Sequence, residues 1–154
     1  MGDPDASGTG PDPELLADEE RLWTEIHALV DALPPARVDE PGYFAEGWSA
    51  KDLIGHIGSW LAEGGVVLER IRFGTYRPHE IDIEAMNERF FTALHDVPFP
   101  TVKAQAITAR ARMLRAWLAL PERSADAARW IDKAGPDHYA EHLPRLRDWV
   151  VEIG

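Results

Sequence analysis

Apolar side chains recur along this sequence at the three- and four-residue spacing of an α-helix, in stretches that prolines interrupt. No stretch alternates between apolar and polar residues from one position to the next, so no β-sheet is predicted. Short connections between helices favour antiparallel neighbours, which predicts an all-α protein folded as an up-and-down four-helix bundle. Helices are predicted from Glu14 to Leu33, from Ser49 through Ile71, from Asp82 through Leu94, from Thr101 to just before Pro121, and from about Asp137 to Ile153.

Polar residues that open helices mark most of these starts. Ser49 and Asp52 have the spacing of a capping box, in which each side chain binds the backbone N–H of the other residue. Asp82, Thr101 and Asp137 are predicted to cap the later helices in the simpler way. The segment between Pro121 and Pro136 is predicted to be a loop.

The 154 residues suit one domain, and a hydrophobic content of 45% suffices for a core. Residues 1–12 are rich in Gly, Pro and Asp without periodicity, so we expect a disordered leader before a single bundle domain at residues 13–154. No apolar stretch approaches the ~18–20 residues that a membrane span needs, and the N-terminus does not resemble a signal peptide. A cytoplasmic protein with no membrane partner is expected.

Composition excludes several kinds of site. The chain has no cysteine, which rules out disulfides, zinc–thiolate sites and a cysteine nucleophile. A formal net charge of −11 argues against nucleic acid as a partner, because binding phosphates needs a basic surface. The motifs of serine hydrolases, P-loop nucleotide sites and di-iron bundles are absent. Histidine, aspartate and glutamate remain as candidate metal ligands.

Three histidines are the strongest of these candidates. His138 and His142 are four residues apart, a spacing that puts both imidazoles on one face of a helix. His56 lies on the apolar face of a different predicted helix, where a third ligand of a site in the bundle core would be needed. Three nitrogen ligands would leave coordination positions open for water or substrate. The alternative is that His138 and His142 are polar surface residues and His56 is a buried core histidine.

The other histidines and the neighbouring carboxylates have weaker claims. His27, His79 and His95 are interpreted as structural or surface residues. Glu141 and Asp137 flank the histidine pair and are candidate hydrogen-bond acceptors for a ligand imidazole, although capping is the preferred role of Asp137.

The stretch from Trp48 to His56, WSAKDLIGH, resembles the W-[ST]-x-x-[DE]-[LV]-[LIV]-x-H signature of the DinB/YfiT-like superfamily. His138 and His142 match the two ligands that this superfamily carries four residues apart on a late helix. The stretch from Ile83 to Phe90 resembles the asparagine-containing helix of the isomerase-like branch. Relatives include the N-terminal domains of mycothiol-dependent maleylpyruvate isomerases and the ClbS/DfsB proteins of colibactin resistance.

The resemblance implies a DinB-like four-helix bundle with a divalent metal ion in its core, bound by His56, His138 and His142. Zinc or nickel is the first expectation for the ion, and iron the second. In the isomerase branch the second ligand is typically glutamate, so His138 gives a neutral three-histidine set instead. Several members are dimers, which implies a homodimer.

The same resemblance implies a function. We expect a thiol-dependent transferase or isomerase, or a related detoxification enzyme such as a hydrolase, acting on a small electrophile with an external low-molecular-weight thiol. The alternative is a non-catalytic or stoichiometric resistance protein that binds a small molecule. Trp48, Trp60 and Asn87 are candidate substrate-pocket residues, with core packing as the alternative for each, and no catalytic residue is assigned.

Overall fold

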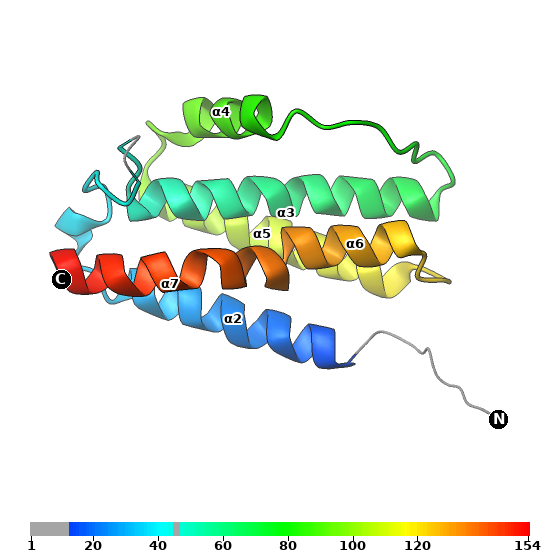
Figure 1. Ribbon diagram of the computed structural model, residues 1–154, viewed down its shortest axis with the longest axis horizontal. Coiled ribbons are helices and arrows are strands. Elements are labelled where there is room, and N and C mark those ends of the chain that lie inside the picture. The colour runs from blue at the N-terminus through cyan, green and yellow to red at the C-terminus, as the bar shows by residue number, and fades with distance from the viewer. Residues whose placement is uncertain (1–12, 45–46) are drawn as a thin grey trace.

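The computed structural model describes residues 13–44 and 47–154, and every regular element within them is helical (Figure 1). This confirms the predicted all-α class. The predicted leader at residues 1–12 lies outside the described residues. The elements are α2 (Pro13–Asp31), a short 3-10 helix η1 (Pro35–Arg37), α3 (Ala50–Arg72), α4 (Ile83–Leu94), α5 (Phe99–Ala119), α6 (Ala125–Ala134) and α7 (Pro136–Ile153).

Local sequence sets the start of α3 and α4 as predicted. The Ser49 side chain accepts a hydrogen bond from the backbone N–H of Asp52, and the Asp52 carboxylate accepts one from the backbone N–H of Ser49 at 2.9 Å. The capping box is therefore complete. Asp82 accepts a hydrogen bond from the backbone N–H of Ala85 and caps α4.

Two predicted caps are wrong. Helix α5 begins at Phe99, with Pro98 at the capping position and no side-chain cap, so Thr101 lies inside the first turn. Asp137 is the second residue of α7, because Pro136 takes the first position, and its carboxylate pairs with Lys133 at 3.4 Å. In α5 a proline takes the capping position, and in α7 Gly135 takes it before Pro136, so neither helix has a polar cap.

The segment predicted as a loop between Pro121 and Pro136 contains α6. Ser124 caps this helix by accepting a hydrogen bond from the backbone N–H of Ala127. Only ten residues long, α6 buries Ala127, Ile131 and Ala134. Two of these three are alanines, which contribute little to an apolar pattern, so the periodicity of this helix is weak in the sequence.

The helix directions differ from the simple up-and-down order. Gly58 packs on Ala106, and further along both helices Gly65 packs on Met113, so α3 and α5 run in the same direction. A Cβ at Gly58 would lie 2.8 Å from the Cβ of Ala106, which shows how closely the two backbones approach. The prediction assumed short connections throughout, whereas an extended segment and α4 return the chain to the end at which α3 began (Figure 1).

Helices α2 and α7 also run in the same direction, opposite to the other pair. Glu19 and Glu25 of α2 bind Tyr139 and Arg147 of α7 in the same order along both helices. Helix α2 binds α5 in reverse order, since its residues Glu19 and Asp31 pair with Arg110 and Lys103. The order of directions along α2, α3, α5 and α7 is therefore up, down, down, up.

The core lies between these four long helices, and α4 lies outside it against α3 (Figure 1). Helix α4 has no buried residue, while α3 buries residues on several faces. Within the described ranges, no helix is long and apolar enough to cross a lipid bilayer. The arrangement leaves α3 facing α6 and α7 on one side, with the segment before α4 beside them.

Candidate metal centre

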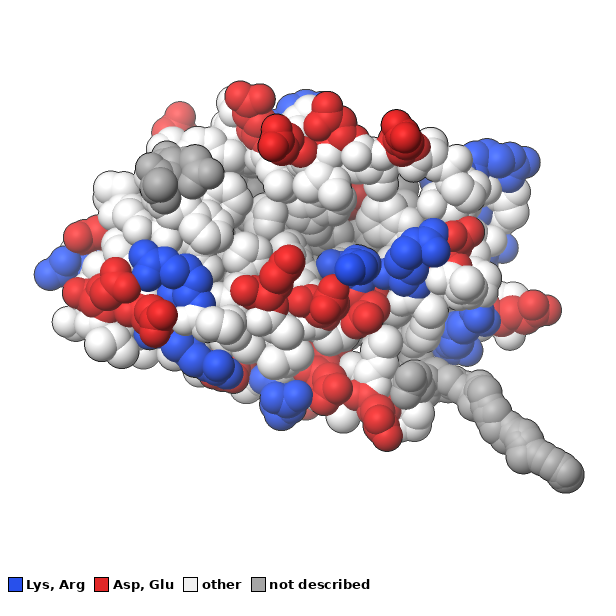
Figure 2. Space-filling view, in the orientation of Figure 1, with Lys and Arg blue, Asp and Glu red and all other residues white. Residues whose placement is uncertain are grey.

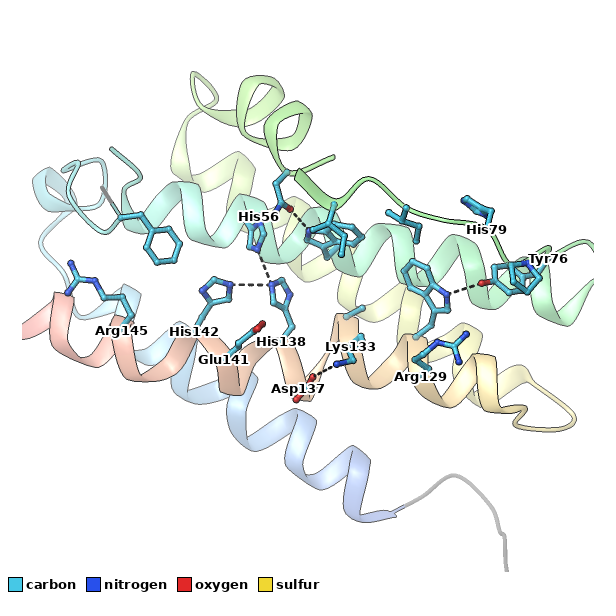
Figure 3. Close-up of a pocket in the computed structure, with 18 residues that line it drawn as sticks. His56, Tyr76, His79, Arg129, Lys133, Asp137, His138, Glu141, His142 and Arg145 are labelled. Carbon is cyan, nitrogen blue, oxygen red and sulfur yellow. Dashed lines mark hydrogen bonds and ion pairs between the residues drawn. The ribbon is translucent and has the colours of Figure 1, made fainter. Parts of the chain in front are cut away.

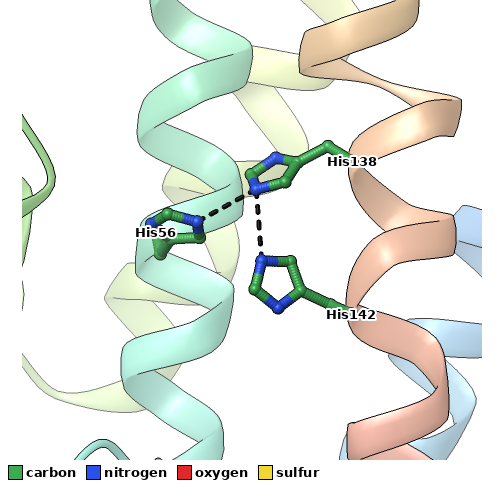
Figure 4. Close-up of side chains that lie close together, drawn as sticks. All are labelled: His56, His138 and His142. Atoms are coloured by element: carbon green, nitrogen blue, oxygen red, sulfur yellow. Dashed lines mark hydrogen bonds between the residues drawn. The ribbon is translucent and has the colours of Figure 1, made fainter. Parts of the chain in front are cut away.

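Three histidine side chains meet where α3 faces α7 (Figure 4). His56 of α3 and His138 of α7 have their Nε2 atoms 2.9 Å apart, and the Nε2 atoms of His138 and His142 are 3.2 Å apart. One nitrogen from each of the three rings lies within 4.8 Å of the others. The structure thus brings together the three candidate ligands that the sequence singled out.

Helix geometry and packing explain this convergence. His138 and His142 project from the same face of α7 because they are one turn apart. Between them Tyr139 points to the opposite side, where its hydroxyl donates to Glu19 of α2 at 3.0 Å and ties α7 to the core. His56 is only 9% exposed and lies on the face of α3 that meets α7.

The nitrogen set suits a cation better than hydrogen bonds alone. A neutral imidazole nitrogen carries either a proton or a lone pair, yet Nε2 of His138 faces two other nitrogens at once. Two nitrogens bound at ~2.05 Å to one tetrahedral ion are about 3.3 Å apart, close to the two distances here. One cation that accepts a lone pair from each ring would satisfy all three atoms.

Burial keeps these imidazoles in the neutral form that binds metal ions. Burial, with smaller effects of the nearby His138 and His142, lowers the pKa of His56 to about 2. Burial lowers the pKa of His138 to about 3 and that of His142 to about 4. At neutral pH the cluster therefore offers lone pairs without first losing protons.

We expect the metal-free protein to lose stability as the pH falls from 7 to 5. The pKa of His27 is also lowered by burial, to about 4, so four histidines have native pKa values below the unfolded value of about 6.5. Below pH 6.5 the unfolded chain takes up protons that the native state does not, so stability present at neutral pH is lost, by up to about 1.4 kcal/mol per pH unit for each histidine. Urea unfolding at several pH values measures this slope. His27→Gln should reduce it without abolishing it, and a stability that is flat from pH 7 to 5 would contradict the expectation.

The outer ring nitrogens of the three histidines differ in their surroundings. Nδ1 of His142 lies 3.3 Å from the hydroxyl of Tyr43. Nδ1 of His56 and Nδ1 of His138 are buried without a hydrogen-bond partner, although the backbone carbonyl of Ala134 lies near enough to the His138 ring to favour its protonated form. Among the described residues, only His142 therefore has a side-chain hydrogen-bond partner at its outer ring nitrogen.

The histidines form part of the wall of a cavity of about 820 Å³ (Figure 3). Trp60 and Asn87 also line it, and the Trp60 indole N–H donates to the Asn87 side-chain oxygen at 2.7 Å. Trp48 does not line the cavity; its ring packs against His56 with 5.0 Å between centroids. Two of the three candidate pocket residues, Trp60 and Asn87, thus line the cavity, and the third, Trp48, packs against His56 instead.

Much of the far wall comes from residues that sequence reasoning did not select. Figure 2 shows this face of the molecule hollowed, with acidic and basic side chains gathered along one rim. His79, interpreted from sequence as structural or surface, lines the cavity, and so does Glu141, for which no contact with an imidazole is found. The remaining unselected lining residues are Phe44 before α3, Tyr76, Pro78 and Ile81 before α4, Ile83 in α4, Arg129, Trp130, Lys133 and Ala134 in α6, and Arg145 in α7.

Comparison with known proteins agrees with this architecture. The model of the mycothiol maleylpyruvate isomerase N-terminal domain family matches residues 20–152. The chain belongs to this family. The match confirms the resemblance drawn from WSAKDLIGH and the histidine pair, and the family match spans all three histidines.

A comparison with solved structures provides information about the fold only. An uncharacterised protein from Escherichia coli UTI89 has a similar structure, with a TM-score of 0.77 and 14% sequence identity over 91% of this chain and 92% of that chain. At this identity the likeness concerns the fold alone. No curated protein matches the sequence significantly.

Proposed function

We propose that this protein binds one divalent metal ion through His56, His138 and His142 and uses it, with a low-molecular-weight thiol, in an isomerase or transferase reaction on a small electrophile. The observation that carries the proposal is the convergence of three neutral imidazole nitrogens, from the buried His56 and His138 and the half-buried His142, on the wall of a cavity of about 820 Å³. Zinc and nickel suit such a nitrogen set best, and iron is the next candidate.

The number and charge of the ligands support a catalytic rather than a structural ion. Three protein ligands leave a coordination position for an exogenous group. When bound, the metal would supply Lewis acidity and lower the pKa of a coordinated thiol or water. Because His138 stands where related isomerases typically have glutamate, the chain's own ligands neutralise none of the ion's charge, which favours an anionic sulfur or oxygen as the remaining ligand.

The rest of the cavity supports a small-molecule substrate. Trp60 and Phe44 give apolar surface near the histidines, and the side chain of Asn87 is held in place by Trp60. Since the chain has no cysteine, any sulfur nucleophile must come from outside it. The family name, which refers to mycothiol, supports a thiol of this kind.

Metal analysis and turnover together test the proposal. Protein purified without chelator should contain close to one equivalent of a divalent metal, or take up zinc or nickel when either is supplied. It should then consume many equivalents of a small electrophile in the presence of a low-molecular-weight thiol. Consumption that stops after about one equivalent would indicate a stoichiometric protector instead, and a protein that takes up neither metal would end the metal-based proposal.

A further inference from the structure

The segment between η1 and α3 touches histidines of both helices that form the cluster. Tyr43, which is 1% exposed, has its hydroxyl 3.3 Å from Nδ1 of His142 and 3.3 Å from the backbone carbonyl oxygen of the same residue. Trp48, at the other end of the segment, packs its ring against His56. Side chains of this segment therefore support His142 on α7 and His56 on α3.

The two contacts of the Tyr43 hydroxyl favour one position for the ring proton of His142. A carbonyl oxygen can only accept, so the single hydroxyl proton is donated to the backbone oxygen of His142. The hydroxyl oxygen is then left to accept a hydrogen bond from Nδ1–H of the imidazole.

Tyr43 is itself fixed by contacts on both sides. Arg145, one turn after His142, donates from Nε to the backbone oxygen of Tyr43 at 2.7 Å and from Nη2 to that of Gly42 at 3.1 Å. Its guanidinium also lies 5.6 Å from the centroid of the tyrosine ring. The backbone N–H groups of Gly42 and Tyr43 both donate to the carbonyl oxygen of Trp48. The hydroxyl is thus held against His142 by α7 and by its own segment.

We propose that Tyr43 is a positioning residue of the histidine cluster, whose hydroxyl holds His142 in the tautomer protonated at Nδ1 and so directs the lone pair of Nε2 toward the other two rings. The expected consequence of this inference is tighter metal binding, and that consequence rests on the proposed function. In proteins that bind metals through histidine, such partners commonly contribute 10- to 100-fold in affinity. Tyr43 supplies this support to His142, whereas within the described part of the chain Nδ1 of His56 and Nδ1 of His138 have no side-chain hydrogen-bond partner.

Tyr43→Phe tests the inference, with Tyr139→Phe as a matched control. Both tyrosines are fully buried and both substitutions remove only a hydroxyl. The hydroxyl of Tyr43 makes its two contacts with His142, whereas that of Tyr139 binds Glu19 on the side of α7 away from the cluster. Zinc affinity is measured by competition with a chromophoric chelator. We expect Tyr43→Phe to weaken it about 10- to 100-fold and Tyr139→Phe to leave it within about twofold, even where its melting temperature falls.

Nitrogen-15 NMR of the histidine rings in metal-free protein gives an independent readout. Wild type should show His142 protonated at Nδ1, and Tyr43→Phe should show a mixture of tautomers. Unchanged zinc affinity in Tyr43→Phe, or an equal loss in both variants, would overturn the inference while leaving the metal site intact. If the wild type binds no metal, the proposed function fails, and the tautomer of His142 in the two proteins still decides the role of Tyr43.

Discussion

Glu19→Ala is expected to lower the free energy of unfolding by about 3–5 kcal/mol, the usual result of removing one partner from a buried ion pair. The Glu19 side chain is 1% exposed and accepts hydrogen bonds from Nε and Nη2 of Arg110, each at 2.7 Å, and from the hydroxyl of Tyr139. Alanine would leave the guanidinium and the hydroxyl partly buried without an acceptor. Chemical denaturation of wild type and variant measures the difference.

An exposed ion pair made by the same helix, α2, provides the control. Glu25 of α2 binds Arg147 with the same two-pronged geometry, but the two side chains are 34% and 52% exposed. Glu25→Ala should cost no more than about 1 kcal/mol, because water already solvates both groups. Equal losses of unfolding free energy in the two variants would show that burial does not determine how much Glu19 stabilises the fold. Glu19→Gln, which keeps the size and one acceptor, should fall between them.

The parts of this protein that sequence predicts correctly depend on residues close together in the chain. The capping box of Ser49 and Asp52 involves one turn of backbone, and it forms as its spacing predicts. His138 and His142 share a helix face for the same reason. His56 is 82 residues from His138, and helix periodicity indicated only that it faces inward. Its association with the other two came from the need of a bundle-core site for a third inward-facing ligand, and then from the family resemblance, rather than from any local rule.

The parts that sequence missed depend on the path of the chain through space. The direction of α5 follows from the extended segment before α4, whose residues carry no periodic pattern. The same segment and the short helix α6 provide the cavity wall opposite the histidines, including His79 and Trp130. Glu19 looks in the sequence like any charged residue on a helix surface, and only the packing of α2, α5 and α7 makes it a buried partner. Such contacts need the fold before they can be recognised.

His138→Ala is expected to weaken divalent metal binding by about two to three orders of magnitude. His138 is the central member of the cluster, because its Nε2 lies 2.9 Å from that of His56 and 3.2 Å from that of His142. Binding free energies of ~10–16 kcal/mol for four-ligand zinc sites correspond to about 3 kcal/mol for each ligand, or roughly a hundredfold or more in affinity. Calorimetric titration of metal-free wild type and variant with zinc gives both dissociation constants.

His79→Ala distinguishes a defined three-nitrogen site from general affinity of the cavity for metal. His79 lines the same cavity and is exposed, but its ring nitrogen Nδ1 lies against the backbone oxygen of Arg77, away from the cluster. Its removal should therefore leave the zinc dissociation constant within about twofold, while folding of both variants is checked by circular dichroism. If the loss in His79→Ala matched that in His138→Ala, the ion would be held by scattered imidazoles of the cavity. The nitrogens that converge between α3 and α7 would then not be the binding site. A site formed by them must lose zinc affinity when His138 is removed and keep it when His79 is removed.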